Sequence, residues 1–261
     1  MYTYKKLSKD TSIDTFEPSD NMRINGVSVN ELVEGYRHLT VSGRGLIGQR
    51  VGTTTVPARR GVWVDEINDL EREIEIKYRL EADSSALMRD RFAKLNKVLR
   101  NSGKILEITF KDEPDYTYYG YFTKADDIEE KSLKNISKFA ILIPDGYKKR
   151  NLQSSTTGLV SLIDADKVLP QRIEATMNTT ANVFKIYNGQ TYLEFNGNYN
   201  SGEKIVIDFS QDEITATISG RNILQDLALF SPLETFYVKN GDKIFAGNAN
   251  VTLVTWRDER L

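Results

Sequence analysis

The sequence contains no cysteine and only one histidine, His38, among its 261 residues. Without cysteine the chain forms no disulfide, uses no thiol nucleophile and holds no metal through thiolates. A serine-type triad or a zinc site would have to include His38. These absences weigh against most hydrolases and metalloenzymes. The sequence therefore predicts a protein that is not an enzyme, with no catalytic residue, no metal and no cofactor.

Long apolar runs are missing as well. Runs such as Phe139–Ile143 have the length of a strand, whereas a membrane-spanning helix needs ~20 apolar residues. The opening residues Met1–Ser8 include lysines but lack the apolar core of a secretory signal. The sequence therefore predicts neither a secretory signal nor a membrane partner.

A strong charge excess is also absent, because the formal net charge is only −2. Such a balance weighs against a dedicated nucleic-acid binder. The charges are nevertheless uneven: residues 1–150 carry 26 basic and 24 acidic side chains, and residues 151–261 carry 9 and 13. The polar stretch Asn151–Gly158 lies at this change and is typical of a linker loop. We therefore expect two domains, 1–150 and 151–261, with the boundary at about 145–160.

Strands dominate the predicted first domain. Residues Arg72–Leu80 alternate between apolar and charged side chains, which is the period of a half-buried strand. Further strands are predicted at 105–110, 116–123 and 139–143. The segment Asp112–Asp115 has the composition of a turn between the first two of these.

One helix is predicted over residues 84–101. Asp83 or Ser84 can cap its first amides, and Gly103 can adopt the left-handed conformation beyond its end. An apolar stripe with a spacing of three to four residues supports the assignment. The stripe consists of Met88, Phe92, Leu95 and Leu99.

The second domain has the pattern of an all-β fold. Short apolar runs alternate with turn residues, as in an antiparallel sandwich. Three Asn-Gly pairs supply the positive φ angles that tight hairpins need; they begin at Asn188, Asn196 and Asn240. The predicted fold class is thus mainly β. The first domain is predicted to be α+β, with a β-sandwich and one helix, and the second domain is predicted to be an all-β sandwich.

The segment Gly43–Gly48 fits the dinucleotide-binding pattern G-x-G-x-x-G. That pattern needs a helix directly after the last glycine, and the threonines, valine and proline of Gln49–Pro57 oppose one. We therefore predict a glycine-rich loop or wide hairpin. Its arginines could contact phosphate or the carboxylates of a neighbouring subunit, or could simply be solvated. They are Arg44, Arg50, Arg59 and Arg60.

Two further groups of side chains are candidates for a function. His38 stands beside no evident carboxylate or nucleophile in the sequence, and we expect a structural role for it. In the tyrosine-rich strand, alternation directs Tyr116, Tyr118 and Phe122 toward the core. Tyr119 and Tyr121 lie on the other face and are the candidates for an interface.

Taken in order, these features carry a family resemblance. The first three are a strand region ending near Phe16, a strand leading into Val41–Gly45 and a polar hairpin reaching Gly61. The alternating strand and the helix follow. The last is the segment Leu106-Glu-Ile-Thr-Phe-Lys-Asp-Glu-Pro-Asp-Tyr-Thr-Tyr-Tyr-Gly120. Met1–Arg150 resembles the N-terminal domain of the distal tail proteins of siphophages that infect Gram-positive bacteria. Residues 160–261 are similar to the galectin-like C-terminal sandwich of that family.

The resemblance implies a structural virion protein at the tail tip, made in the host cytoplasm. It implies a homohexameric ring that is built by residues 1–150. On one side this ring would meet the tail tube or the tail terminal ring. It would connect them to the tail-associated fibre or lysin protein and to receptor-binding proteins during host adsorption. Genomic DNA passes through such a ring without specific binding. Basic walls would retain DNA, so the resemblance places Arg44, Arg50, Arg59 and Arg60 at subunit contacts rather than in the channel.

An alternative function stays open at this point. Sandwich domains with exposed aromatic residues often bind sugars, so the chain could be a carbohydrate-binding module or a receptor-binding protein that recognises host cell-wall polysaccharide. In that case Tyr192 and Trp256 are the expected stacking platforms.

Overall fold

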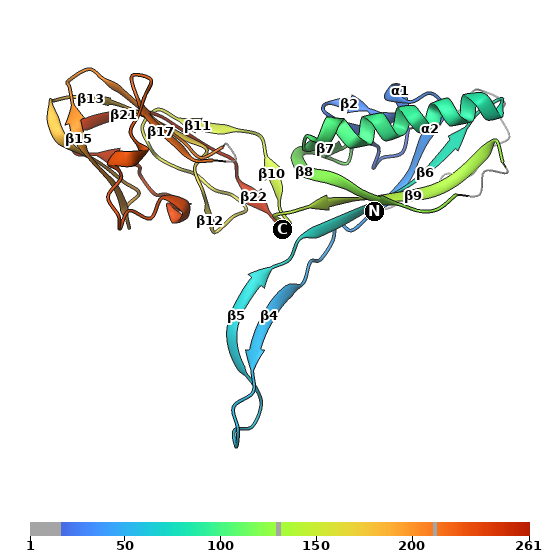
Figure 1. The fold of residues 1–261 in the computed structure, drawn as a ribbon, viewed down its shortest axis with the longest axis horizontal. Coiled ribbons are helices and arrows are strands. Elements are labelled where there is room, and N and C mark those ends of the chain that lie inside the picture. The colour runs from blue at the N-terminus through green and yellow to red at the C-terminus, as the bar shows by residue number, and fades with distance from the viewer. Residues whose placement is uncertain (1–16, 129–131, 211–212) are drawn as a thin grey trace. The chain divides into compact units, whose positions relative to one another are not determined.

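A computed structural model describes residues 17–128, 132–210 and 213–261. The strand region expected to end near Phe16 lies outside the described residues. The chain divides into two compact units (Figure 1): unit 1 comprises Met1–Pro114 and Tyr119–Asp145, and unit 2 comprises Asp115–Tyr118 and Gly146–Leu261. Strands dominate both units, which confirms the mainly β prediction. No helix of the described residues is long and apolar enough to span a membrane.

Unit 1 is built on a sheet in which neighbouring strands follow the order β2-β1-β7-β8-β9-β6-β3. The predicted alternating strand is β6, whose apolar residues are buried and whose charged residues, apart from buried Arg72, face the other side. The elements of this sheet are β1 (Met22–Ile24), β2 (Val27–Ser28), the short helix α1 (Val29–Leu32), β3 (Tyr36–Ser42), β6 (Arg72–Glu81), β7 (Leu106–Phe110), β8 (Glu113–Ala125) and β9 (Lys134–Ile143).

The predicted helix is α2 (Ser85–Arg100), which lies along one face of the sheet (Figure 1). Its N-cap is Ser84, whose hydroxyl accepts a hydrogen bond from the Leu87 amide at 3.2 Å. Its C-cap is Asn101, which is left-handed (φ 44°), and Gly103 beyond the end of the helix is left-handed as predicted (φ 81°). Asparagine tolerates this conformation, and the helix is followed directly by the short 3₁₀ helix η1 (Asn101–Gly103).

The turn between β7 and β8 is shorter than the sequence predicted. The chain reverses at Lys111 and Asp112, and β8 already begins at Glu113. Pro114 therefore lies within the strand, near its start, where proline is tolerated.

Unit 2 contains a six-stranded sheet in the order β11-β21-β13-β16-β17-β18 and a three-stranded sheet in the order β15-β14-β20. Part of the predicted linker, Gln153–Ser155, instead forms strand β11, because its backbone pairs with β21. The strands are β11 (Gln153–Ser155), β13 (Arg172–Met177), β14 (Ala181–Tyr187), β15 (Tyr192–Tyr199), β16 (Lys204–Asp208), β17 (Thr215–Ile218), β18 (Arg221–Asn222), β20 (Phe245–Ala246) and β21 (Ala249–Trp256).

Shorter elements complete unit 2. Strand β10 pairs with β22 and with Tyr116–Tyr118 of β8, and β12 pairs with β19. These elements are β10 (Lys148–Arg150), β12 (Lys167–Val168), the 3₁₀ helices η2 (Leu224–Asp226) and η3 (Leu233–Thr235), β19 (Val238–Lys239) and β22 (Glu259–Arg260).

The core of unit 2 is apolar and closed. Phe184 and Phe195 are fully buried with ring centroids 6.0 Å apart, and Phe236 is equally buried. Two of the three Asn-Gly pairs form the predicted turns, since Gly189 and Gly241 have φ near +90°. The third prediction was wrong: Asn196 and Gly197 lie inside β15, where their backbone is extended.

A buried carboxylate holds one end of unit 2 together. The side chain of Asp258, which is fully buried, accepts hydrogen bonds from the amides of Ile163, Asp164, Ala165 and Glu259 at 2.6–3.0 Å. Four donors satisfy both carboxylate oxygens, which offsets the cost of burying the charge. Asp258 thereby connects the loop before β12 to the last strand.

Candidate functional site

A two-stranded hairpin in unit 1 pairs only with itself in the sheet arrangement of the described residues. Strands β4 (Gln49–Thr54) and β5 (Trp63–Asp69) run antiparallel, with Val51 opposite Ile67 and Thr54 opposite Trp63. Isolated two-stranded hairpins are only marginally stable in water. This hairpin, residues 49–69, is called the arm below.

The arm exposes nearly all of its side chains, including large apolar ones. Every residue of β5 is exposed, as is every residue of β4 except half-buried Gly52. Val51, Trp63, Val64 and Ile67 each expose between 48% and 57% of their surface. Exposed apolar groups gathered on one element are a common mark of a protein interface.

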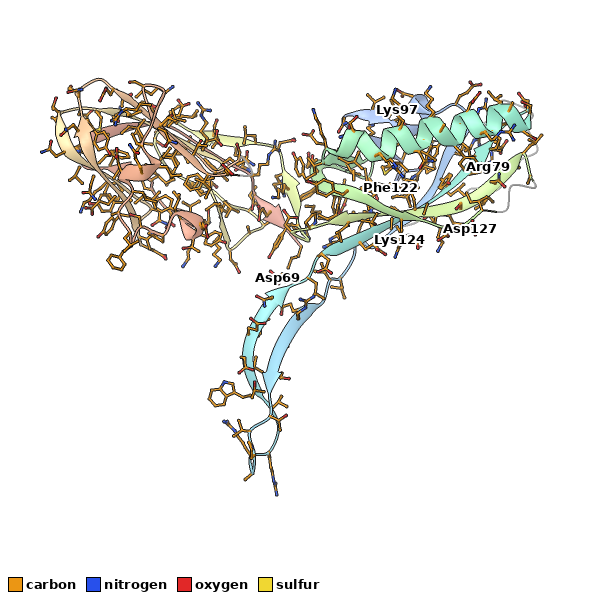
Figure 2. All side chains as sticks on the ribbon, in the orientation of Figure 1. Asp69, Arg79, Lys97, Phe122, Lys124 and Asp127 are labelled. Atoms are coloured by element: carbon orange, nitrogen blue, oxygen red, sulfur yellow. The ribbon has the colours of Figure 1, made fainter. Side chains whose placement is uncertain are left out.

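Polar contacts between the two strands stiffen the arm. Gln49 donates to Asp69 at 3.0 Å near the base, where Figure 2 labels Asp69, and the Thr54 hydroxyl donates to Asp65 at 2.6 Å. The arm is therefore ordered by side chains that leave its apolar residues exposed.

The base of the arm is fixed by a buried arginine and a glycine. Arg72 of β6, only 2% exposed, donates from Nη1 to the carbonyl oxygens of Gly43 and Gly45 at 3.0 Å each. Gly43 has φ +88°, and a side chain there would collide with the carbonyl oxygen of Glu73. The glycine-rich segment is thus a tight connection from β3 into the arm, which agrees with the predicted glycine-rich loop and not with a nucleotide site.

Arg44 clamps the same base. Its guanidinium donates to both carboxylate oxygens of Asp112 at 2.7 Å, lies 3.4 Å from a Glu113 oxygen and covers the Phe110 ring at 4.6 Å. Its side chain is only 18% exposed. A planar guanidinium is suited to this bidentate, stacked arrangement. Arg44 therefore makes its contacts within unit 1.

The other three candidate arginines lie on the arm itself. Arg50 is exposed on β4, and Arg59 and Arg60 are exposed in the connection between the strands. The Arg59 guanidinium lies 4.7 Å above the ring of Trp63. The structure thus places Arg50, Arg59 and Arg60 on one exposed element and Arg44 at its base.

The two candidate tyrosines lie elsewhere in unit 1. Tyr121 of β8 is 43% exposed and Tyr119 is half-buried, whereas Tyr116 and Tyr118 are buried. The predicted division between the two faces of this strand therefore holds for the tyrosines, while Phe122, predicted to face the core, is half-buried.

The exposed apolar residues of the arm were not predicted from the sequence. Val62–Val64 has the composition of a strand, but nothing local distinguishes a buried strand from one that extends into solvent. The only available signal was the polar sequence on either side, which leaves the segment no second apolar run to pack against.

His38 has a carboxylate neighbour that the sequence did not reveal. Its Nε2 lies 3.6 Å from an oxygen of Asp20, and its side chain is fully buried. Burial opposes ionisation of Asp20, but the interactions with His38 and the hydrogen bond from the Val41 amide together hold the pKa of Asp20 below its usual value. Because water and substrate do not reach this imidazole, the pair is structural. The described residues contain no group of three metal-ligating side chains.

Unit 2 presents an aromatic row on its three-stranded sheet. Tyr187 stands between Tyr192 and Phe245, with ring centroids 5.6 and 5.0 Å away. Tyr192 and Phe245 are 46% and 45% exposed. The expectation that Trp256 is a stacking platform was wrong: it is 3% exposed, and its indole N–H donates to the Ser161 carbonyl oxygen at 3.1 Å.

Comparison with known proteins gives two family matches that follow one another along the chain. Residues 30–143 match the family described as phage tail protein RIFT-related domain, and residues 165–259 match the siphovirus-type tail component, C-terminal domain. A search of curated protein sequences found no match.

A solved structure shares the fold of this chain. The Dit protein of phage SPP1, described as a hub adsorption apparatus of phages that infect Gram-positive bacteria, is 18% identical with a TM-score of 0.72, over 92% of this chain and 99% of that one. Two structures of the phage p2 baseplate in its activated conformation, with strontium or calcium, are 12% identical with a TM-score of 0.48, over 87% of this chain and 91% of theirs.

Proposed function

Because this chain belongs to the distal tail protein family of siphophages, and is thus a structural component of the phage tail hub, we propose that it forms a homohexameric ring at the tail tip through unit 1. In this proposal the ring joins the tail tube to the tail-associated fibre or lysin protein and carries receptor-binding proteins. DNA passes through its channel, and the protein acts by geometry rather than catalysis.

The arm is the observation that carries the proposal. A stiff hairpin with exposed valines, Ile67 and Trp63 gains stability when a second surface covers it, because burial removes apolar area from water. A neighbouring copy around a rotation axis offers that surface once per subunit. Arg50, Arg59 and Arg60 would then pair with carboxylates of the neighbour and set the register.

The anchoring of the arm supports the same proposal. Arg44 and Arg72 fix its base to β6 and to the turn before β8. A fixed base reduces the conformational entropy that the arm loses on docking, so more of the burial energy remains for assembly.

Substitution in the arm tests the ring. We expect the wild-type chain to form six-membered rings in negative-stain micrographs and light scattering, and Ile67→Asp to shift it to smaller species. The matched control is Ile163→Asp, since Ile163 is 70% exposed in unit 2. Wild-type monomers at all concentrations, or rings that persist in Ile67→Asp, would contradict the proposal.

Trp63 supplies a second readout. The chain has two tryptophans, and Trp256 is already buried. Assembly through the arm should therefore shift Trp63 emission to shorter wavelength as concentration rises, and Trp63→Phe should remove the shift.

The aromatic row favours a second candidate function, recognition of cell-wall polysaccharide by unit 2. Tyr192 and Phe245 offer exposed rings, and the ion pair between Lys185 and Glu194 (2.7 Å) lies beside Tyr192. Titration with host cell-wall polysaccharide tests it, with Tyr192→Ala as the variant and Tyr121→Ala as the control. Absence of binding by the wild-type chain would remove this candidate.

A further inference from the structure

The turn between β1 and β2 is an Asn-Gly pair, one of four such pairs in the sequence. Asn25 and Gly26 both have positive φ, at 50° and 82°, and Ile24 pairs with Val27 across them. This is the geometry of a tight two-residue hairpin. Both turn residues are exposed. The other pairs begin at Asn188, Asn196 and Asn240.

Asparagine is a chemically labile residue, above all when glycine follows it. In deamidation, the amide nitrogen of the next residue loses its proton to hydroxide and attacks the asparagine Cγ, and glycine has no Cβ to hinder this attack. The new N–Cγ bond closes a succinimide ring, while the Cγ–Nδ2 bond breaks. Nδ2 takes a proton from water and leaves as ammonia. Water then opens either ring carbonyl, which gives aspartate or isoaspartate.

The side chain of Asn25 is held through its oxygen. The Glu107 amide of β7 donates to Asn25 Oδ1 at 3.2 Å, and the Asn25 amide donates to the Glu107 carbonyl oxygen at 2.8 Å. Among the residues that the structure describes, neither Asn25 Nδ2 nor the Gly26 amide has a hydrogen-bond partner. A donor at Oδ1 stabilises negative charge that develops on this oxygen during attack at Cγ. The contact with Glu107 therefore activates Asn25.

Two of the other pairs are protected by hydrogen bonds. Asn188 is 2% exposed, and its Nδ2 donates to the Tyr237 carbonyl oxygen at 2.6 Å. After Asn240 the attacking nitrogen would be the Gly241 amide, which donates to the Val160 carbonyl oxygen at 2.9 Å. Ring closure at either pair has to break the hydrogen bond, which slows the reaction.

The remaining pair is protected by its strand and by a charge. Asn196 is exposed but lies within β15, where it pairs with Val183. Strand pairing opposes the backbone rotation that ring closure requires. The Asp226 carboxylate is close to Gly197, because a Cβ at Gly197 would stand 2.7 Å from Asp226 Oδ2. A negative charge beside an amide disfavours the loss of its proton.

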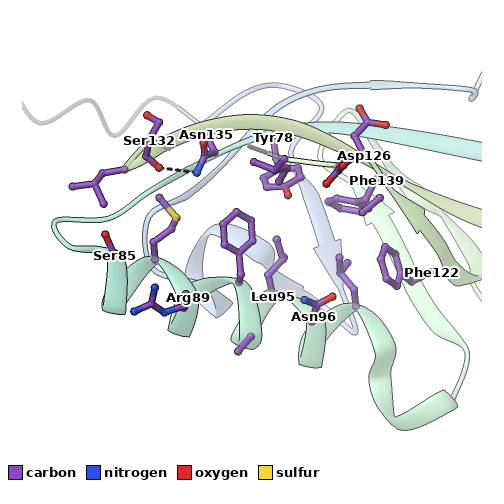
Figure 3. Close-up of a pocket in the computed structure, with 18 residues that line it drawn as sticks. Tyr78, Ser85, Arg89, Leu95, Asn96, Phe122, Asp126, Ser132, Asn135 and Phe139 are labelled. Carbon is purple, nitrogen blue, oxygen red and sulfur yellow. Dashed lines mark hydrogen bonds between the residues drawn. The ribbon is translucent and has the colours of Figure 1, made fainter. Parts of the chain in front are cut away.

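Asn135 of β9 shows the same kind of protection without a glycine. Its Nδ2 donates to the Ser132 carbonyl oxygen at 2.9 Å, as drawn in Figure 3, and the residue is 7% exposed. The next residue is Ile136, whose branched side chain hinders the attacking nitrogen. Asn25 differs from Asn135 in all three respects: exposure, hydrogen bonding of Nδ2 and the residue that follows.

We propose that Asn25-Gly26 is a self-modification site, at which the protein deamidates to aspartate and isoaspartate without an enzyme. The Gly26 amide is the nucleophile, Asn25 Nδ2 leaves as ammonia, and the Glu107 amide stabilises the charge on Oδ1 in the transition state. Water and its hydroxide are the co-reactants. The inference does not rest on the proposed ring, because the reaction needs one copy of the chain.

The products change the β2-β1 edge of the unit 1 sheet. Both add one negative charge at position 25, and isoaspartate also inserts a methylene carbon into the backbone. A two-residue turn sets the register of its hairpin, so the longer backbone no longer matches the pairing of Ile24 with Val27. Asn25 also bonds to Glu107 through its own amide. Isoaspartate therefore loosens β1 from both β2 and β7.

Peptide mass spectrometry of the full-length chain, incubated at mildly alkaline pH, tests the proposal. Trypsin then releases residues 24–37, which contain Asn25 and no other Asn-Gly pair. Isoaspartate in this peptide is identified by methylation with a protein isoaspartate methyltransferase and S-adenosylmethionine. We expect Asn25 to deamidate about tenfold faster than the asparagine of any other Asn-Gly pair, because one hydrogen bond corresponds to about a tenfold change in rate.

Two controls separate the effect of the structure from that of the dipeptide. In guanidinium chloride the Glu107 contact and the protecting hydrogen bonds are absent, so the four pairs should deamidate at similar rates. In the native chain, Asn25→Gln should abolish modification at position 25, because the longer side chain would have to close a six-membered ring. The matched variant Asn240→Gln should leave the rate at Asn25 unchanged.

The outcomes are distinct from those of the ring proposal. Native deamidation at Asn25 that is no faster than at Asn188 overturns the inference. A preference for Asn25 that persists in guanidinium chloride overturns it as well, since the folded contacts are then not its cause. A preference that is lost on unfolding supports it. Rings or monomers in micrographs bear on the proposed function alone, because the peptide is read out in the same way from either.

Discussion

The arm of unit 1 and the sandwich of unit 2 are both antiparallel β structure, yet they treat apolar side chains in opposite ways. In unit 2 the apolar residues of the strands meet in one core that includes Phe184, Phe195 and Phe236. In the arm, Trp63 and Ile67 face solvent. The strands of unit 2 thus bury their apolar side chains within the unit, whereas those of the arm leave Trp63 and Ile67 exposed.

The comparison shows that strand pairing and core formation are separate requirements. Backbone hydrogen bonds and side-chain contacts such as Thr54 to Asp65 suffice to order the arm. The arm therefore forms without burying apolar area, although such burial supplies most of the stability of a domain.

The largest expected effect comes from removing a core aromatic. Phe184→Ala should destabilise unit 2 by about 3–5 kcal/mol, since it leaves a cavity against Phe195. Trp63→Ala in the arm should change the stability of the unassembled chain by less than about 0.5 kcal/mol. The loss in Phe184→Ala is measured by denaturant unfolding followed by Trp256 emission. This variant is made in a Trp63→Phe background, so that Trp256 is its one tryptophan. Equal losses for both would break the comparison.

Removing the buried carboxylate should cost nearly as much. Asp258→Ala leaves the amides of Ile163, Asp164 and Ala165 without their acceptor, for an expected loss of about 3 kcal/mol. Asp258→Asn keeps one acceptor oxygen and should lose less. The same unfolding experiment ranks the three proteins, and an alanine variant as stable as wild type would show that these hydrogen bonds contribute nothing.

A smaller effect is expected at the base of the arm. Arg44→Ala removes the paired hydrogen bonds to Asp112 and the contact with Phe110, for a loss of about 1–2 kcal/mol. Amide hydrogen exchange in β4 should accelerate, since the arm loses one of its two anchors. Arg50→Ala, an exposed control on the arm, should leave exchange unchanged. Unchanged protection in Arg44→Ala would mean that Arg72 alone holds the base.

The smallest expected effect is a loss of stability of unit 2 at acid pH. Hydrogen bonds from Lys204 and Arg172 hold the pKa of Glu174 below its ordinary value of 4.5. Its ion pairs therefore stabilise unit 2 above that pH and lose this contribution, about 1 kcal/mol or less, as the pH falls from about 5 toward 3. Glu174→Gln should flatten the pH dependence of the unfolding midpoint. If the unfolding midpoint depends on pH equally in the wild type and in Glu174→Gln, the ion pairs of Glu174 do not make this contribution.

Local patterns in the sequence were sufficient for the elements whose signals are contained within a few residues. The alternation of Arg72–Leu80 predicted β6, and the stripe from Met88 to Leu99 predicted α2 with its Ser84 cap. Asn196-Gly197 failed as a turn because pairing with β14 holds it extended. Tertiary pairing overrides turn propensity when a neighbouring strand satisfies the backbone.

The candidate site was only partly predictable, for a similar reason. The arginines of the arm were identified by type and position, but the partner of Arg44 is 68 residues away and could not be inferred from spacing. The exposed apolar residues of the arm were missed, since exposure depends on what the rest of the chain covers.

The sequence by itself determined the mainly β character, the single long helix and the glycine connection into the arm, because periodicity and backbone freedom are properties of neighbouring residues. Only the tertiary structure decided that Asp258 is enclosed by amides, that Arg44 clamps a turn, and that Asn25 is exposed while Asn188 is buried. Those outcomes depend on which distant segments meet, and burial is a property of the folded whole.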